Sequence, residues 1–537
     1  MALLVRTFAF IAILAIYFAL GWLNWEMAGK IGVLGIFAIL AVSAWTTRNG
    51  TETRVGKICV LLVLLPFLSL VGFQAFLREY FGVGADEEMV VGAIFSTDRF
   101  EASEFLQQQA LPILKHASLV IVFSILFALA LRFGTRPRVA PAADRPQQAN
   151  WKPAALFAAI FLLLNLSSSL RNQNPLLVLP IRYREYAHDL EATRSLQLSL
   201  AATASDPQLN SLRCLDEAPR TVVFVLGESV TRLNLSSAGY SRKTTPELDA
   251  LGDQLIWFSD VIACEPSTLP AIKKMLTPAD LARPGLWANK PDLITMAKRT
   301  GYKTFWISNH STDTKGIISI FASRADKAVF TNHGSSRGEG SFDEVVLPPL
   351  AEALHDPAPR KLIILHVLNA HPAYYFRYPS SFGRFNNADD KVTAGLKAQG
   401  RAFWAIKMRN HYDNALVYMD HVLERSVEIC RESSQPVAWL FVSDHGQDAA
   451  HYSNFCGHNA LVRSQYEIPM IFWHSASFPA PSIDHSVVRN RPYQTDLLDH
   501  TLLGLMGISG DYYDPRGDIF SVAFEPVPRA ILGKPYP

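Results

Sequence analysis

The sequence TVVFVLGES at residues 221–229 sets the architecture of the C-terminal part of the chain. An unbroken run of apolar and β-branched residues that ends in Gly227 and Glu228 is typical of a parallel strand buried on both faces. Further runs of this kind alternate with helical stretches and lie at residues 255–262, 303–308, 361–368, 437–443 and 468–473. This alternation predicts an α/β domain with a mostly parallel sheet covered by helices on both faces.

Polar residues follow these predicted strands at their carboxyl ends, the edge where active sites of such sheets lie. They are Glu228, Cys264, Thr268, His371, Asp444 and His445. Carboxylates and imidazoles at one edge suit a borderline divalent ion such as zinc. Each residue alone is a weak signal, and it is their joint placement at successive strand ends that predicts a metal site.

The first third of the chain contains five apolar runs, at residues 7–23, 31–45, 58–76, 117–131 and 154–170. A membrane-spanning helix needs about 20 apolar residues, and the second and fourth runs reach that length only with polar flanks. Basic residues precede the first run and also gather between the second and third and between the fourth and fifth. The positive-inside rule therefore places the N-terminus in the cytoplasm, and five spans place the C-terminal part outside it.

These patterns predict a transmembrane domain at residues 1–171, a linker at 172–218 and a catalytic domain at 219–537. An amphipathic helix at 181–203 lies on the membrane surface or serves as an ordinary connector. The formal net charge is only +2 and the sequence lacks nucleic-acid-binding motifs, so we expect no nucleic-acid partner.

Four cysteines follow the last apolar run: Cys214, Cys264, Cys430 and Cys456. Outside the cytoplasm, disulfides among them would be allowed. Four cysteines permit three pairings, and buried free thiols fit the sequence equally well. Several histidines, His310 among them, are interpreted as surface or satisfied core groups rather than as ligands.

Motifs spread over the whole chain resemble those of the bacterial phosphoethanolamine transferases of the alkaline phosphatase and sulfatase superfamily. They lie at residues 227–232, 239–248, 371–379, 412–416, 419–420, 443–446 and 457–459. The resemblance implies a five-helix transmembrane N-terminal domain and an α/β alkaline phosphatase/sulfatase-like periplasmic domain. It also implies that the protein is a multi-pass protein of the bacterial inner membrane, with the catalytic domain in the periplasm.

The resemblance implies roles for the residues at the strand ends. Glu228, Asp444 and His445 match the family's zinc ligands. Thr268 matches the nucleophile, which also contacts the metal. The cofactor implied is zinc, as one ion or two.

Other residues match the family's substrate contacts. His371 and His458 match histidines near the substrate phosphate or a second zinc, and either is a candidate general acid or base. Lys315 and Thr97 match residues that contact substrate.

The implied reaction moves phosphoethanolamine from phosphatidylethanolamine to lipopolysaccharide, at its core or lipid A, or to another envelope glycan, through a phosphorylated Thr268. Donor and acceptor are both held in membrane lipid, which accounts for the anchor. Lys274 stands where lipid A-modifying members carry a second cysteine, and residues 293–308 look closer to core-modifying members. The sequence therefore favours a core acceptor.

Two other enzymes of the superfamily remain as alternatives. Residues 264–267 match most of the sulfatase signature, but Thr268 stands where that signature has Arg. A lipid-polymer synthase that uses phosphatidylglycerol shares the spans and the threonine, although the motifs at 244–248 and 374–379 favour the ethanolamine group. A catalytically inactive membrane scaffold would be expected to have lost part of the metal set, which is complete in this chain.

Overall fold

The computed structural model describes residues 2–48, 51–52, 54–81, 99–133, 151–198, 206–310, 317–332, 342–479 and 485–536. The chain forms two compact units, which we call the N-terminal unit (Met1–Thr97 with Leu106–Leu190) and the C-terminal unit (Asp98–Phe105 with Glu191–Pro537). Two residues with predicted substrate contacts, Thr97 and Lys315, lie outside the described residues.

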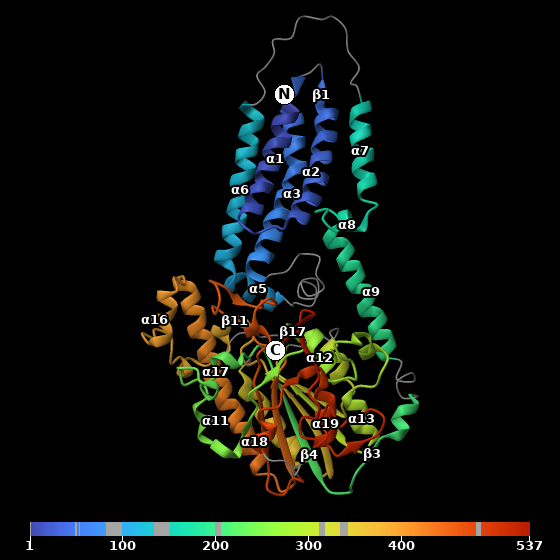
Figure 1. The fold of residues 1–537 in the computed structure, drawn as a ribbon, viewed down its shortest axis with the longest axis vertical. Coiled ribbons are helices and arrows are strands. Elements are labelled where there is room, and N and C mark those ends of the chain that lie inside the picture. The colour runs from blue at the N-terminus through green and yellow to red at the C-terminus, as the bar shows by residue number, and fades with distance from the viewer. Residues whose placement is uncertain are drawn as a thin grey trace, which may run out of the picture. The chain divides into compact units, whose positions relative to one another are not determined.

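The N-terminal unit is built from helices, and a helix overlaps each of the five apolar runs (Figure 1). They are α1 (Ala2–Ala19), α2 (Trp25–Thr46), α3 (Arg54–Phe81), α6 (Ala110–Phe133) and α7 (Lys152–Leu164). Among the described residues, three segments are long and apolar enough to cross a membrane: Trp25–Thr46, Val55–Tyr80 and Ala110–Arg132. Helices α1 and α7 are apolar but shorter.

The prediction of one helix at 154–170 is wrong, because α7 ends at Leu164 and a separate short helix, α8 (Ser168–Arg171), follows. The Asn165 side chain donates a hydrogen bond to the backbone oxygen of Phe161 (2.7 Å) and accepts one from Asn174 (2.7 Å). Asparagine that bonds to nearby backbone in this way competes with continuation of a helix. Helix α9 (Val178–Leu198) follows and occupies most of the segment predicted to be an amphipathic helix.

The C-terminal unit contains a seven-stranded sheet in the order β5-β13-β10-β4-β9-β7-β8. Its strands are β4 (Arg220–Gly227), β5 (Ile256–Trp257), β7 (Lys303–Ser308), β8 (Lys327–Phe330), β9 (Arg360–His366), β10 (Val437–Ser443) and β13 (Met470–His474). Strands β10, β4, β9, β7 and β8 run parallel, whereas β13 is antiparallel to β10 and β5 to β13. The predicted, mostly parallel sheet is confirmed.

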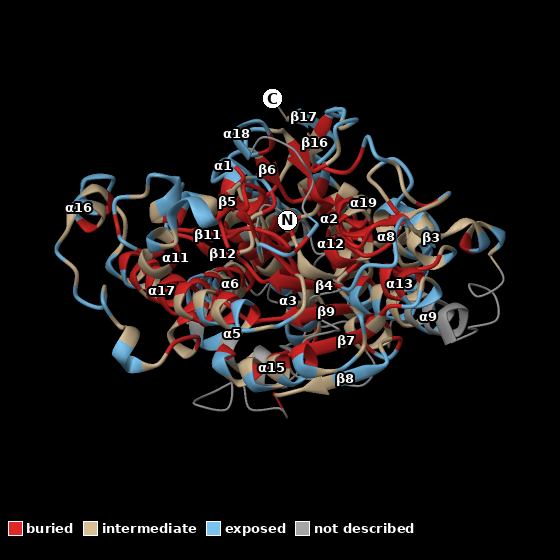
Figure 2. Cartoon of the chain, turned by 90° about the horizontal axis from the view of Figure 1, so that it is seen from below, coloured by how far each residue is buried: buried red, intermediate tan, exposed pale blue. Residues whose placement is uncertain are grey.

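The central strands are buried along their whole length, which explains their unbroken apolar sequences (Figure 2). In the register of the sheet, Phe224 of β4 lies between Leu440 of β10 and Ile364 of β9. Helices α11 (Pro246–Ala250) and α17 (Phe403–Arg431) cover one face. Helices α12 (Thr268–Met275), α13 (Leu293–Arg299) and α19 (Leu498–Leu505) cover the other.

The prediction of one strand at 255–262 is wrong, because the structure divides this run into β5 and β6 (Val261–Ile262). The polar residues between them bond elsewhere: Asp260 pairs with Arg529 (2.7 Å), and Ser259 donates to the backbone oxygen of Arg489 (3.0 Å). Strand β6 then pairs with β14 (Tyr493–Gln494) rather than extending the large sheet.

Shorter elements complete the described fold. They are β1 (Thr47–Arg48), β2 (Thr51–Glu52), α5 (Arg99–Gln108), β3 (Arg213–Cys214), α14 (Ile317–Ala322), α15 (Leu347–His355), α16 (Lys391–Ala398), β11 (Asp448–Ala449), β12 (Cys456–Gly457), α18 (His485–Val488), β15 (Ile508–Ser509), β16 (Arg529–Ile531) and β17 (Lys534–Tyr536). All five cysteines are free thiols, and Cys264, Cys430 and Cys456 are buried.

A buried charge network fixes α17 to the segment after β4. Asp413 of α17 is fully buried and accepts hydrogen bonds from Asn234 (2.6 Å), Tyr240 (2.8 Å) and Arg242 (2.6 Å). Arg242 is also buried and reaches Asp390 (2.8 Å). Such a network is strongly destabilised when one partner is removed, because the other charge is left buried without compensation.

We therefore expect Asp413→Ala to lower the free energy of unfolding of the C-terminal unit by about 3 kcal/mol. Urea denaturation of the full chain in detergent micelles, followed by tryptophan fluorescence, measures this change. The matched control is Asp389→Ala, since the Asp389 side chain is 88% exposed and its ion pair with Lys397 is long (3.4 Å). Equal stability losses in the two variants would contradict the assigned role of Asp413.

Candidate metal centre

Parallel strands at the middle of the sheet bring the predicted site residues to one edge of the C-terminal unit. Glu228 directly follows β4, and Asp444 and His445 directly follow β10. The register of the parallel strands pairs Gly227 with Ser443, so Glu228 and Asp444, the next residue on each strand, lie next to each other. The structure thus brings together the strand-end residues that the sequence singled out.

Thr268 reaches this edge from the first position of α12. Its hydroxyl donates a hydrogen bond to Glu228 Oε2 (2.9 Å) and lies 3.3 Å from His445 Nε2. The N-terminus of a helix carries a partial positive charge, which favours negative charge developing on this oxygen. The hydroxyl is therefore placed where it can be activated as a nucleophile.

The donor set fits a divalent metal ion. Ligand atoms of Glu228, Asp444 and His445 all lie within 4.8 Å of one another, and all three residues are buried. Asp444 Oδ2 is buried and accepts no hydrogen bond from any described residue. A buried carboxylate oxygen without a partner is costly unless a cation compensates it.

The electrostatics of the cluster also favour a cation. Burial and the neighbouring Glu228 carboxylate raise the pKa of Asp444 to about 8. Burial alone would lower the pKa of His445, but Asp444 and Glu228 raise it to about 9. Two buried carboxylates share one imidazole, so the cluster attracts further positive charge.

Backbone hydrogen bonding orients the His445 ring toward this cluster. Its Nδ1 lies 2.7 Å from the backbone oxygen of Gly446, which can only accept a hydrogen bond. The neutral ring therefore has its proton on Nδ1, and the lone pair of Nε2 then faces Glu228 (3.3 Å) and Asp444 (3.5 Å). This is the usual arrangement of a metal-binding histidine. Without a metal, the raised pKa means that Nε2 also carries a proton at pH 7.

The backbone around the site is tightly constrained. A side chain at Gly446 would collide with the backbone oxygen of Ser464. Three non-glycine residues near the site have positive φ angles: Ser229 (61°), Asn369 (36°) and Ala373 (66°). Left-handed backbone at such residues costs free energy and is concentrated at functional sites.

Gln465 is a site residue that the sequence analysis missed. Its side chain is fully buried, and its Nε2 donates to the backbone oxygens of Pro266 (2.8 Å) and Gly446 (2.9 Å). It thus connects the loop before Thr268 to the loop that carries His445. The residue lies in a short turn and has no recognisable motif, so only the folded structure identifies it.

His371 and His458 lie beside the cluster. The His458 ring packs edge-on against His445 with ring centroids 4.7 Å apart, and His371 Nδ1 is buried without a hydrogen-bond partner among the described residues. Burial lowers the pKa of both imidazoles to about 3. Both rings are therefore neutral at pH 7, and their lone pairs are available to a cation or to a hydrogen-bond donor.

Asp343 supports the loop that carries His371, and it too was missed. Its buried carboxylate accepts hydrogen bonds from the backbone amides of Leu368 (2.8 Å) and Asn369 (2.7 Å) and from the Asn309 side chain (2.9 Å). These bonds hold the strained turn at Asn369 in place.

Comparison with known proteins identifies the family. The sulfatase family profile matches residues 220–508. Phosphoethanolamine transferase EptC of Escherichia coli (strain K12) is 32% identical over 483 residues, which cover 84% of this chain and 80% of that protein. The chain belongs to the phosphoethanolamine transferases, within the sulfatase superfamily. It is an enzyme of this type.

Within this family, the chain is more similar to some members than to others. Phosphoethanolamine transferase CptA of Salmonella typhimurium is 31% identical over 510 residues, covering 90% of this chain and 85% of that protein. Phosphoethanolamine transferase EptA of Escherichia coli (strain K12) is 24% identical over 476 residues, covering 83% of this chain and 82% of that protein. The chain therefore lies closer to EptC and CptA than to EptA.

Two solved structures bear on the metal and on the fold. A zinc complex of the C-terminal periplasmic domain of Escherichia coli EptC is 34% identical with a TM-score of 0.55, covering 59% of this chain and 90% of that one. The integral membrane enzyme EptA of Neisseria meningitidis has a TM-score of 0.62 at 20% identity, covering 96% of this chain and 95% of that one. The latter shares the fold, including the membrane part. Together with the donor set at Glu228, Asp444 and His445, the zinc complex supports zinc as the metal.

The structure does not favour a sulfatase nucleophile at Cys264. Its side chain is 4% exposed, and burial raises the pKa of its thiol. A buried thiol of raised pKa is unreactive. Thr268, and not Cys264, reaches the carboxylate cluster.

We expect Gln465→Leu to weaken zinc binding by about 10- to 100-fold, as does the loss of other groups that orient metal ligands. Leucine has a similar shape but removes the side-chain donor that links the Pro266 and Gly446 oxygens. Competition with a chromophoric chelator measures the affinity. The exposed Gln399 provides the control variant Gln399→Leu, and unchanged affinity in Gln465→Leu would contradict this role.

Proposed function

We propose that this chain transfers phosphoethanolamine from phosphatidylethanolamine to lipopolysaccharide, with Thr268 as the residue that carries the group between them. The observation that carries the proposal is the position of Thr268 Oγ1, 2.9 Å from Glu228 Oε2 and 3.3 Å from His445 Nε2. A zinc ion held by Glu228, Asp444, His445 and Thr268 would supply Lewis-acid chemistry that favours the alkoxide of Thr268.

Each half-reaction makes and breaks one phosphorus–oxygen bond. In the first, Thr268 Oγ1 attacks the phosphorus of phosphatidylethanolamine, and its hydroxyl proton moves along the hydrogen bond toward Glu228 Oε2. The bond to diacylglycerol breaks, and this same proton passes to the diacylglycerol oxygen, so that diacylglycerol leaves as an alcohol. In the second, the oxygen of an acceptor hydroxyl attacks the same phosphorus, and the proton of that hydroxyl passes to Thr268 Oγ1 as it leaves.

His371 and His458 suit the second half-reaction. Both imidazoles are neutral because burial lowers their pKa to about 3. A neutral imidazole can accept a hydrogen bond from an incoming acceptor hydroxyl and so orient it for attack. His458 is next to His445 and so lies beside the nucleophile, which makes it the stronger candidate for this contact.

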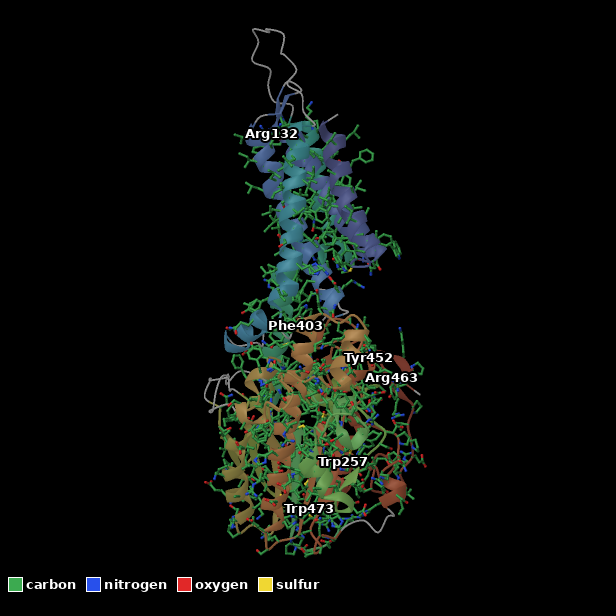
Figure 3. All side chains as sticks on the ribbon, turned by 90° about the vertical axis from the view of Figure 1, so that its left-hand side faces the viewer. Arg132, Trp257, Phe403, Tyr452, Arg463 and Trp473 are labelled. Atoms are coloured by element: carbon green, nitrogen blue, oxygen red, sulfur yellow. The ribbon has the colours of Figure 1, made fainter. Side chains whose placement is uncertain are left out.

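The exposed surface of the C-terminal unit suits a substrate held in a bilayer. Phe403 is 82% exposed and Tyr452 49% exposed, and both lie toward the same end of this unit, opposite Trp473 (Figure 3). Leu461, three residues after His458, is 64% exposed. Apolar and aromatic side chains of this kind favour contact with lipid.

For the membrane topology, we propose five spans, with the N-terminus in the cytoplasm and the C-terminal unit in the periplasm. The support is that a helix overlaps each apolar run, that the fold is shared with an integral membrane enzyme, and that basic residues are distributed unevenly among the connections. Thr97 and Lys315 remain proposed substrate contacts, since both lie outside the described residues.

We further propose the lipopolysaccharide core as the acceptor. The greater similarity to EptC and CptA than to EptA supports this choice. A second observation is local to the nucleophile. By resemblance, Lys274 stands where lipid A-modifying members of the family have a cysteine. The buried Lys274 side chain forms an ion pair with the partly exposed Glu265 (2.7 Å).

Intact-mass measurement of the full chain in detergent micelles, after incubation with phosphatidylethanolamine and zinc, tests the reaction. We expect wild type to gain the mass of one phosphoethanolamine group and to release diacylglycerol, and Thr268→Ala to do neither. Thr300→Ala is the matched control, because the Thr300 hydroxyl lies at the end of α13 and donates to the backbone oxygens of Met296 and Ala297 in the same helix. An adduct that persists in Thr268→Ala, or unchanged diacylglycerol release, would refute the assignment.

A further inference from the structure

A charged cluster lies among the helices of the N-terminal unit, whereas the proposed metal ligands belong to the C-terminal unit. Glu79 lies near the end of α3, and Lys115 and His116 lie near the start of α6, which packs against α3 (Figure 1). One carboxylate oxygen of Glu79 lies 2.6 Å from Lys115 Nζ, and the other lies 2.8 Å from His116 Nε2. Ionisable side chains within membrane-spanning segments are rare and mark a functional site by default.

Aromatic rings line this cluster. The Lys115 ammonium lies 4.6 Å from the centre of the Trp22 ring and 5.8 Å from that of Tyr80. The His116 ring packs edge-on against Trp22, with centroids 5.1 Å apart. Phe76 and Tyr80 pack against His116 in the same way, at 6.1 and 6.0 Å. Aromatic faces of this kind bind ammonium ligands, and a neighbouring carboxylate adds the opposite charge.

The cluster is open to the surroundings at Lys115 and closed at His116. The side chains of Lys115 and Glu79 are 40% and 26% exposed, whereas that of His116 is 4% exposed. An ion pair with this much exposure contributes little stability, so the Lys115 ammonium can leave Glu79 at low cost.

His116 leaves the cluster with room for a further hydrogen-bond donor. Its Nε2 faces a carboxylate that only accepts hydrogen bonds, so the neutral ring has its lone pair on Nδ1. This nitrogen is buried and has no hydrogen-bond partner among the described residues. Buried polar atoms of side chains are almost always satisfied by protein, water or a ligand.

The cluster lies where the membrane-spanning segments meet the lipid headgroups. Glu79 is next to the end of the segment Val55–Tyr80, and Lys115 is near the start of Ala110–Arg132. Trp22 lies in the connection between α1 and α2. In the proposed topology, all three positions are at the periplasmic side, and tryptophan and tyrosine are enriched at this depth.

We propose that Glu79, Lys115 and the Trp22 ring bind the headgroup of phosphatidylethanolamine in the periplasmic leaflet. The Lys115 ammonium itself shows that a primary ammonium fits beside the Glu79 carboxylate and over the Trp22 ring. The lipid ammonium takes this place, and Lys115 turns to the lipid phosphate, which a short ethylene chain joins to that ammonium. Both charges of the protein stay paired in this exchange. An anionic headgroup fits less well, because it has no ammonium to offset Glu79.

This inference rests on the proposed function for the identity of the lipid, but binding is measured without transfer. The experiment uses the full chain with Thr268→Ala in nanodiscs that contain phosphatidylethanolamine with a photoreactive diazirine near the glycerol end of one acyl chain. Illumination followed by peptide mass spectrometry locates the label. Unmodified phosphatidylethanolamine, phosphatidylcholine and phosphatidylglycerol serve as competitors.

The site variants are Glu79→Gln and Trp22→Leu, each added to Thr268→Ala. Trp22→Leu retains the ion pair of Glu79 with Lys115, so it tests the site even if Glu79→Gln does not fold, and thermal unfolding in detergent checks each variant. Glu26→Gln is the matched control, because Glu26 is 55% exposed and pairs with Lys30 near the start of α2.

We expect label around Trp22, Glu79 and Lys115, which phosphatidylethanolamine reduces far more than the other two lipids. Glu79→Gln should lower this label about tenfold, the order of one hydrogen bond to a charged group. Trp22→Leu should lower it about threefold, the order of one cation–π contact. Glu26→Gln should leave it unchanged.

An absence of label in these segments, label that all three lipids reduce equally, or label that persists in both site variants would overturn the proposal. If the label behaves as expected but the chain with native Thr268 gains no phosphoethanolamine, the proposed function fails and the headgroup site stands.

Discussion

Two carboxylates buried at adjacent strand ends place the main physical constraint on the C-terminal unit. Glu228 and Asp444 lie side by side because β4 and β10 pair in parallel register up to Gly227 and Ser443. One imidazole, His445, faces both of them, and one oxygen of Asp444 has no hydrogen-bond partner among the described residues. Such a concentration of negative charge is tolerated in a protein interior when a cation compensates it. The proposed nucleophile Thr268, the turns with positive φ angles and the hydrogen bonds that orient His445 all surround this one cluster.

The rest of the unit keeps these groups in place. Glycine at position 446 allows the chain to pass against the Ser464 backbone, and Gln465 ties this loop to the one before Thr268. The Asp413 network fixes α17 against the segment that follows Glu228. The same sheet edge also carries His310 and His366, because neighbouring parallel strands end together.

The sequence predicts those parts that depend on local pattern. Strands β7 and β10 have the predicted bounds because their apolar runs end sharply at polar residues, and parallel strands necessarily bring Glu228, Asp444 and His445 to one edge. Parts that depend on tertiary contacts were missed. The split between β5 and β6 follows from the Asp260–Arg529 pair, and Gln465 and Asp343 act through backbone groups distant in sequence. His310 was interpreted as a surface or satisfied core residue, since its proximity to His366 and Glu228 arises only in the folded sheet.

We propose that Glu228, Asp444, His445 and Thr268 together hold a zinc ion. Anomalous X-ray diffraction from crystals of the zinc-loaded protein, collected above and below the zinc absorption edge, locates the ion. We expect an anomalous peak between these four side chains, with Thr268 Oγ1 among the atoms in contact with the ion. A fully loaded protein with no peak at this position, or with zinc bound only elsewhere, would contradict it.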